Sequence, residues 1–151
     1  MRSARRRSRE LAVQGMYQWL HTGGTASKII KDLADLDGFE QADGEFLAAE
    51  LKGTIASVAE LRERLEPLAD RPWDEVSPVE RSILLIGAWE IAHQKDIPFR
   101  VTINEAIELG KRFGGTDGHK YVNSILDKLA GELRPGEAAQ KARQGKRRND
   151  R

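Results

Sequence analysis

The chain has 151 residues, of which 39% are hydrophobic and 32% are charged. This length fits one domain or two small packed halves, and this composition is typical of a folded protein rather than a disordered one. There is no cysteine, which excludes disulfides, thiolate metal sites and a cysteine nucleophile, and fits a reducing cytoplasm. No apolar run approaches the roughly 18 residues of a membrane span, and the basic N-terminus lacks the apolar core of a signal peptide. We therefore expect a cytoplasmic protein without a membrane segment.

The net charge of +1 conceals a strong segregation of charge along the chain. Residues 1–9 contain five arginines and no acid, and residues 134–151 contain seven basic and two acidic residues. The stretch between them has 13 basic and 22 acidic residues. Basic ends are suited to polyanions, and an acidic body is suited to a basic protein. Taken alone, however, the segregation favours the simpler explanation that charged ends keep the protein soluble.

The first half of the chain shows helical periodicity in three stretches. Residues 4–22 place apolar side chains on one face and end at Gly23-Gly24. Residues 26–36 form a shorter amphipathic stretch. After a loop that contains glycines, residues 45–66 predict one long helix that is stopped near Pro67.

The second half carries clearer helix signals. Ser77-Pro78-Val79-Glu80 is a capping box with proline at the first helical position, and it predicts a helix over 78–93. This helix is apolar nearly all round, so we expect it at the centre of a bundle. Thr102-Ile103-Asn104-Glu105 is interpreted as a second capping box, opening a helix that ends at Gly114-Gly115. A last helix is expected over 117–133, which gives an all-α protein of six or seven helices.

Motifs of enzymes and metal sites are scarce. None of His21, His93 and His119 has a second histidine or a carboxylate at the spacing of metal ligands. Residues 114–120 are rich in glycine but lack the order of a phosphate-binding loop, and no predicted strand precedes them. Serines and threonines are interpreted as helix caps, without a nucleophile elbow. We expect no catalytic residue, no metal and no cofactor.

The N-terminal arginines are followed by an aromatic side chain on the same helical flank. Arg6, Glu10, Gln14 and Tyr17 share this flank, beside the apolar stripe. Because arginine contacts phosphates with a planar fork and tyrosine can stack on an unpaired base, the flank is a candidate platform for single-stranded RNA. A solvated helix start with Tyr17 at the edge of the core fits the same residues, and the pattern does not separate the two interpretations.

A second cluster lies where the last two predicted helices meet, and it comprises Phe113, Asp117, Lys120 and Tyr121. The glycines between Phe113 and Asp117 allow a tight turn, and Asp117 and Tyr121 lie one helical turn apart. A carboxylate at this place is interpreted either as an acceptor for a base amino group or as a helix cap, of which the cap is the commoner.

Several segments of the chain resemble the NusB family of bacterial antitermination factors. The resemblance rests on residues 4–19 (ARRRSRELAVQGMYQW), 101–111 (VTINEAIELGK) with Phe113-Gly114, and 119–128 (HKYVNSILDK). Val79-Glu80-Arg81 and the helix that contains Glu90 fit as well. The match spans about residues 4–134. Tyr121 stands where the family often has phenylalanine, and Ser124 where it often has glycine, but neither change removes a ring or a charge.

The resemblance implies a fold and a function. It implies a helical RNA-binding domain over 1–134 with two packed sub-bundles, about 1–70 and 71–134, followed over 135–151 by a basic tail that we expect to be disordered. It also implies an antitermination factor that binds boxA RNA jointly with NusE, a ribosomal protein that doubles as a transcription factor. The complex would load onto RNA polymerase together with NusA and NusG, notably in ribosomal RNA operons.

The resemblance also implies site residues. The RNA-binding side chains would be Arg5, Arg6, Arg7, Gln14, Tyr17, Phe113, Asp117, Lys120 and Tyr121. The NusE-binding side chains would lie on the predicted 78–93 helix, at Glu80, Arg81 and Leu84. This division agrees with the charge segregation, because ribosomal proteins are usually basic and the body of this chain is acidic.

Three alternatives stay open. The same fold resembles the N-terminal RNA-binding region of ribosomal RNA cytosine methyltransferases, in which case this chain would be a detached fragment. A protein–protein adaptor that never touches RNA would use its arginines only for solubility. A homodimer is also possible, and it would bury the same arginine-rich helix that we expect to bind RNA.

Overall fold

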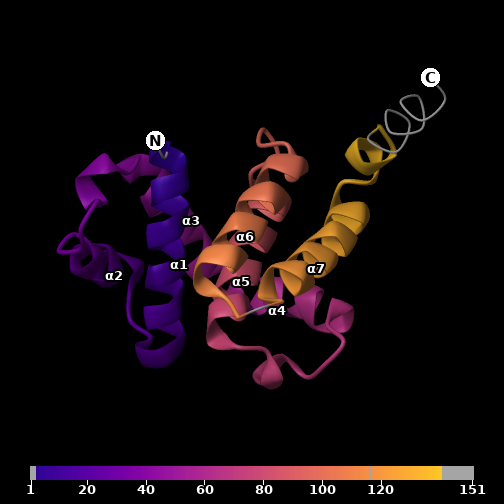
Figure 1. Cartoon of the computed structure of the whole chain (residues 1–151), viewed down its shortest axis with the longest axis horizontal. Helices are drawn as coiled ribbons and strands as arrows, with labels where there is room; N and C mark the ends of the chain where they lie inside the picture. The colour runs from indigo at the N-terminus through magenta and orange to yellow at the C-terminus, as the bar shows by residue number, and fades with distance from the viewer. Residues whose placement is uncertain (1–2, 116, 141–151) are drawn as a thin grey trace.

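The computed structural model describes residues 3–115 and 117–140, and its α-helices lie in two neighbouring groups (Figure 1). The first group holds α1 (Ala4–Thr22), α2 (Ala26–Leu33) and α3 (Gly44–Ala56). The second group holds α4 (Val58–Leu65), α5 (Pro78–His93), α6 (Phe99–Phe113) and α7 (Gly118–Leu133). Short 3-10 helices occur at Phe39–Gln41, Glu66–Leu68 and Trp73–Glu75, and no strand occurs in the described part of the chain. The all-α prediction with two packed sub-bundles is confirmed.

The starts of α1 and α5 follow from capping residues. Ser3 Oγ accepts a hydrogen bond of 3.1 Å from the backbone N–H of Arg6, and Ser77 Oγ accepts one of 3.1 Å from the backbone N–H of Glu80. Each bond satisfies one of the backbone donors that the first turn of a helix leaves without a partner. Both helices therefore have the bounds that the sequence predicts.

The long helix expected over 45–66 is wrong, because the chain bends at Ser57 into α3 and α4. The backbone N–H of Ser57 is shared between the carbonyls of Gly53 and Thr54, and its φ and ψ of −109° and 9° leave the helical region. Before the bend the chain packs on α1, α2 and α5, and after it on α5 and α7. The apolar spacing continues across the bend, since both helices face one core. We group α4, which begins directly after Ser57, with the second set of helices because it packs on α5 and α7.

The second capping box is also wrong, because α6 begins at Phe99, directly after Pro98. Thr102 lies inside α6 and is buried, and its Oγ1 donates a hydrogen bond of 2.9 Å to Glu90 Oε1. The first turn is instead satisfied from the far end of the chain, where Glu137 Oε2 accepts a hydrogen bond of 3.1 Å from the Phe99 N–H.

Residues 135–140 are helical, although they were expected to belong to a disordered tail. They are held by Glu137, through Phe99, and by Ala138, which packs against the core. Just before them, the buried Arg134 donates hydrogen bonds to the carbonyls of Glu90 and Ile91 at the C-terminal end of α5. The rest of the expected tail lies outside the described residues.

Helix α5 forms the centre of the molecule, as its all-round apolar pattern predicts. It is buried continuously from Ser82 to Ile91 and packs against α1, α3, α4, α6 and α7. The close approach of α3 depends on Gly53, because a Cβ at that position would lie 2.2 Å from the ring of Trp89. Helix α5 thus joins the two groups into one continuous core.

None of the described helices combines the length and the apolar character that crossing a bilayer requires.

Candidate nucleic-acid interface

The three consecutive arginines near the start of α1 contact different neighbours. Arg5 is exposed and places its guanidinium 4.6 Å from the ring centre of Phe46. Arg6 donates two parallel hydrogen bonds, of 3.0 and 2.9 Å, to the carboxylate of Glu105 on α6. Arg7 lies 3.5 Å from Glu10 Oε2. All three are therefore ordered by contacts rather than fully solvated.

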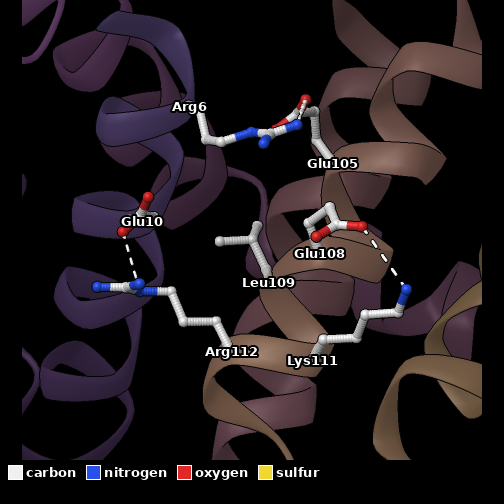
Figure 2. Close-up of a pocket in the computed structure, with 7 residues that line it drawn as sticks. All are labelled: Arg6, Glu10, Glu105, Glu108, Leu109, Lys111 and Arg112. Atoms are coloured by element: carbon white, nitrogen blue, oxygen red, sulfur yellow. Dashed lines mark hydrogen bonds and ion pairs between the residues drawn. The ribbon is translucent and has the colours of Figure 1, made fainter. Parts of the chain in front are cut away.

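Two ion pairs connect α1 to α6, and each helix supplies the arginine of one pair and the glutamate of the other (Figure 2). Arg6 of α1 binds Glu105 of α6, and Arg112 of α6 binds Glu10 of α1 at 3.0 Å. Between them the two helices enclose a hollow of about 320 Å³, with Leu109 on its wall. The hydrogen bonds and the negative charge of Glu105 raise the pKa of Arg6, so this arginine stays charged.

Gln14 and Tyr17 continue the same flank of α1 toward its C-terminal end. Both are exposed, and the ring centre of Tyr17 lies 4.4 Å from that of His21. Tyr17 is 43% exposed, which both a residue of the RNA platform and a residue at the edge of the core allow. Its ring lies on the same helix as the ordered arginines and is accessible for stacking on an unpaired base.

The junction of α6 and α7 carries the second predicted cluster. Phe113 and Tyr121 are half-buried against the core. The guanidinium of Arg71 lies 4.2 Å from the ring centre of Tyr121, and burial is the main cause that raises the pKa of Tyr121. Asp117 and Lys120 are both 74% exposed and form an ion pair of 3.4 Å. Asp117 stands at the N-cap position of α7, but its side chain accepts no capping hydrogen bond from the described residues.

The predicted partner residues differ in their access to solvent. Glu80 and Arg81 are half-buried, and Glu80 lies against the first turn of α7, where a Cβ on Gly118 would come within 2.7 Å of Glu80 Oε1. Leu84 is wrong as a contact residue, because it is 0% exposed in the core and no partner can reach it in the folded protein. The accessible part of this predicted surface therefore adjoins Asp117 at the start of α7.

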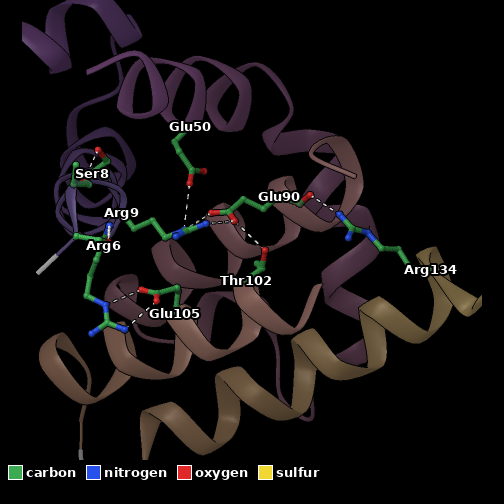
Figure 3. A network of polar contacts seen from close by, with 10 residues as sticks. Arg6, Ser8, Arg9, Glu50, Glu90, Thr102, Glu105 and Arg134 are labelled. Carbon is green, nitrogen blue, oxygen red and sulfur yellow. Dashed lines mark hydrogen bonds and ion pairs between the residues drawn. The ribbon is translucent and has the colours of Figure 1, made fainter. Parts of the chain in front are cut away.

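Beneath the interface lies a buried polar network that the sequence did not reveal (Figure 3). Arg9 of α1 donates two hydrogen bonds of 2.9 Å to Glu90 of α5, which also accepts one from Thr102 of α6. Glu50 of α3 is the fourth member, with its Oε1 at 3.8 Å from Arg9 Nε. The network joins four helices and fixes the turn of α1 that follows the exposed arginines.

One buried arginine faces two buried carboxyl groups in this network. Burial raises the pKa of Glu50 well above its ordinary value, and the hydrogen bond and charge of Glu90 raise it further. Burial also acts to raise the pKa of Glu90, but the hydrogen bonds from Glu50, Arg9 and Thr102 outweigh it and lower that pKa. Protonation of Glu50 leaves one carboxylate for one guanidinium, which avoids an uncompensated buried charge.

The predicted RNA-binding residues thus fall into two sets, one on the flank of α1 and one at the α6–α7 junction. Side chains outside both sets connect them. Glu10 and Arg112 connect the α1 flank to the α6–α7 junction, and the Arg112 guanidinium lies 5.4 Å from the ring centre of Phe113. Arg112 and Arg71 are the basic residues at this surface that sequence reasoning missed. Arg112 ends a predicted helix beside Phe113, which was the only signal available for it.

Comparisons with known proteins agree with this architecture. A family model described as the NusB family matches residues 6–131. The transcription antitermination protein NusB of Paraburkholderia phymatum is 53% identical over 143 residues, which cover 95% of this chain and 99% of that protein. The protein of the same description from Burkholderia cenocepacia is 54% identical over 136 residues, covering 90% and 94%.

A solved structure of T. maritima NusB has the same fold, with a TM-score of 0.79 at 29% identity, and the alignment covers 93% of this chain and 99% of that one. The match of the family model over most of the chain, the two relatives above 50% identity and the shared fold all indicate one family. The chain belongs to the NusB family of transcription antitermination proteins.

Proposed function

We propose that this protein binds boxA RNA jointly with NusE and enters the antitermination complex of RNA polymerase with NusA and NusG, notably at ribosomal RNA operons. The observation that carries the proposal is the continuous surface along α1 and the α6–α7 junction. Ordered, partly exposed arginines lie there beside exposed or half-exposed rings, and such a combination is suited to single-stranded RNA.

On this surface the RNA would contact phosphate-binding and stacking side chains. Arg5, Arg6 and Arg7 would meet phosphates, Gln14 and Tyr17 would meet bases along α1, and the chain of contacts would continue across the α6–α7 junction. The junction residues are Phe113, Asp117, Lys120 and Tyr121. Asp117 is 74% exposed and forms an exposed ion pair with Lys120, so its carboxylate is accessible as an acceptor for a base amino group.

NusE would bind beside the RNA, at the start of α5. Glu80 and Arg81 lie there, and Glu80 packs against the first turn of α7, next to Asp117. Because the two surfaces adjoin at α7, one RNA strand could touch both proteins, which supports joint binding rather than two independent events.

The test is binding of labelled boxA RNA and of a scrambled RNA, with and without NusE, at near-physiological salt. We expect boxA to bind more tightly than the scramble, and NusE to increase the difference. Equal and weak binding to both RNAs that NusE does not change would contradict the proposal.

A companion variant separates the two surfaces. Glu80→Lys should weaken NusE association and leave binding of RNA by the isolated protein largely unchanged. A collapse of RNA affinity in the absence of NusE would place Glu80 in the RNA surface instead.

A further inference from the structure

A second hollow lies on α1 beside the proposed RNA surface and faces the segment that joins α2 to α3. Its volume is about 570 Å³. Glu10 and Arg112 line both this hollow and the one between α1 and α6, so the two share a wall. Its other lining side chains are mostly polar and include Arg7, Gln14, Leu36, Asp37 and Gln41.

The wall of this hollow is attached to α1 rather than formed by a free loop. Ser8 is fully buried, and its Oγ donates to the carbonyl of Asp43 at 2.8 Å. The backbone N–H of Asp43 donates in turn to the carbonyl of Ala4 at 3.3 Å. These bonds hold the α2–α3 segment against the first turns of α1, so the hollow exists before any ligand arrives.

Gly38 positions the guanidinium of Arg7 at this wall. Its φ of +85° is a conformation that favours glycine, and a Cβ there would lie 3.0 Å from both Cζ and Nε of Arg7. The guanidinium therefore packs against the backbone of Gly38. From this position Arg7 shares Glu10 Oε2 with Arg112, at 3.5 and 3.0 Å. Two guanidinium groups thus meet at one almost buried carboxylate, and each keeps other donors for a further anion.

We propose that this hollow is a subsite for one nucleotide of single-stranded RNA, an inference that rests on the proposed RNA-binding function. Arg7 and Arg112 bind the phosphate of that nucleotide. The base lies on Leu36, an apolar side chain that is 42% exposed. The amides of Gln14 and Gln41 and the carboxylate of Asp37 hydrogen-bond to the edge of the base.

The chemistry of the lining favours a nucleotide over a protein segment. Two exposed amides and an exposed carboxylate offer both donors and acceptors, as the edges of bases require, and the phosphate-binding arginines stand on one side of them. The hollow is also continuous with α1, so an RNA strand on the predicted flank reaches it at Gln14 without leaving the surface. The α2–α3 segment, to which the family resemblance assigned no role, becomes part of the RNA path.

The test combines crosslinking with two exposed substitutions. BoxA RNA that carries 4-thiouridine is bound to the unmodified full chain and irradiated, and we expect a crosslink within residues 36–41. Leu36→Ala combined with Gln41→Ala should weaken boxA binding by about three- to tenfold, as expected for the loss of one apolar contact and one hydrogen bond. Val101→Ala is the matched control, because Val101 is 43% exposed and does not line the hollow.

The outcomes distinguish the subsite from the proposed function. Selective boxA binding by the unmodified chain, with no crosslink in 36–41 and no effect of the double variant, overturns the subsite and leaves the function standing. Absence of selective boxA binding by the unmodified chain, with NusE present, overturns both. A double variant that loses NusE binding but keeps RNA binding also overturns the subsite, because the hollow would then be a protein contact. Thermal unfolding of the variant, monitored by circular dichroism, checks that it is folded.

Discussion

Arg6 and Arg9 lie three residues apart on α1, and each binds a glutamate of another helix with two parallel hydrogen bonds of about the same length. The side chain of Arg6 is 43% exposed and binds Glu105, whereas the side chain of Arg9 is 5% exposed and binds Glu90. The geometry of the two pairs is nearly the same. The two pairs differ in how far their side chains are exposed to solvent.

This difference assigns the two arginines to different tasks. An exposed ion pair contributes little to stability, because water and salt compete for both charges, and its arginine can exchange a carboxylate for a phosphate at little cost. A buried pair cannot exchange partners, since removing one charge leaves the other desolvated. We therefore infer that Arg9 holds the fold together beneath the surface on which Arg6 is available to RNA.

The largest effect is expected where the buried pair is broken. Arg9→Met leaves Glu90 without a cation in the core, so the free energy of unfolding should fall by about 3–5 kcal/mol. Arg6→Met removes the same chemical group three residues earlier and should cost at most about 1 kcal/mol. Urea denaturation of both variants measures the difference. Equal losses would show that burial is not what separates the two pairs.

The same network predicts a dependence of stability on pH. Because the pKa of Glu50 is raised in the folded protein, folding retains a proton that an unfolded glutamate loses near its ordinary pKa of 4.5. Above that value the free energy of unfolding should fall as pH rises, by up to about 1.4 kcal/mol per pH unit, until Glu50 ionises in the folded state. Glu90 acts in the opposite sense, because its lowered pKa makes the folded state lose stability as pH falls below the ordinary value.

Glu50→Gln isolates the contribution of Glu50, since the amide keeps a donor for Glu90 and cannot ionise. As pH rises above the ordinary pKa of 4.5, the wild type should lose stability relative to this variant, until Glu50 ionises in the folded protein. Glu60→Gln, a change at a partly exposed glutamate of α4, is the control and should follow the wild type. Parallel profiles for the wild type and Glu50→Gln would show that Glu50 is already ionised in the folded protein.

The sequence predicted the helices whose ends depend on local contacts and missed the features that depend on tertiary contacts. The bounds of α1 and α5 were predicted because the signals for them are local: an apolar face that ends at Gly23-Gly24 for α1, and the capping box at Ser77 for α5. The bend at Ser57 was missed, because two helices that share a core keep one apolar spacing. Thr102 was misassigned, because its hydroxyl satisfies Glu90 of another helix rather than its own first turn.

The candidate site shows the same limit. The sequence placed Arg6 and Tyr17 on one flank of α1, but a spacing rule cannot tell an exposed arginine from a buried one. Arg6 and Arg9 differ in exposure because different helices face them. Leu84 was assigned to the partner surface through the family resemblance, and the helix that holds it is apolar all round, so its pattern gave no indication of its outer face. The RNA-binding and NusE-binding roles themselves stay predictions.

A smaller effect is expected on RNA binding when Arg6 is neutralised. Arg6→Gln should weaken boxA binding by roughly three- to tenfold and reduce the slope of log affinity against log salt by about 0.7, as expected for one lost phosphate contact to a single strand. Arg64→Gln on α4 is the matched control, because Arg64 is 44% exposed and pairs with Glu60. Titrations at several salt concentrations measure both quantities. Equal effects of the two variants would mean that net charge, rather than Arg6, determines affinity.

The smallest expected effect is on boxA binding when the partner of Arg6, rather than Arg6 itself, is changed. In the free protein Glu105 occupies the fork that a phosphate would use, so Glu105→Gln should tighten boxA binding by about two- to threefold at low salt, with the gain fading as salt rises. Stability should change by less than about 1 kcal/mol, since the pair is only partly buried. Glu60→Gln, which removes an equal charge on α4, should leave the affinity nearly unchanged.

Weaker boxA binding by Glu105→Gln would indicate a different role for Glu105. Glu105 would then orient the guanidinium of Arg6 toward the RNA instead of competing with it, and the exposed pair would be a positioning device like the buried one. The sign of this small change therefore decides whether exposure alone separates Arg6 from Arg9, or whether both arginines depend on their glutamates for geometry.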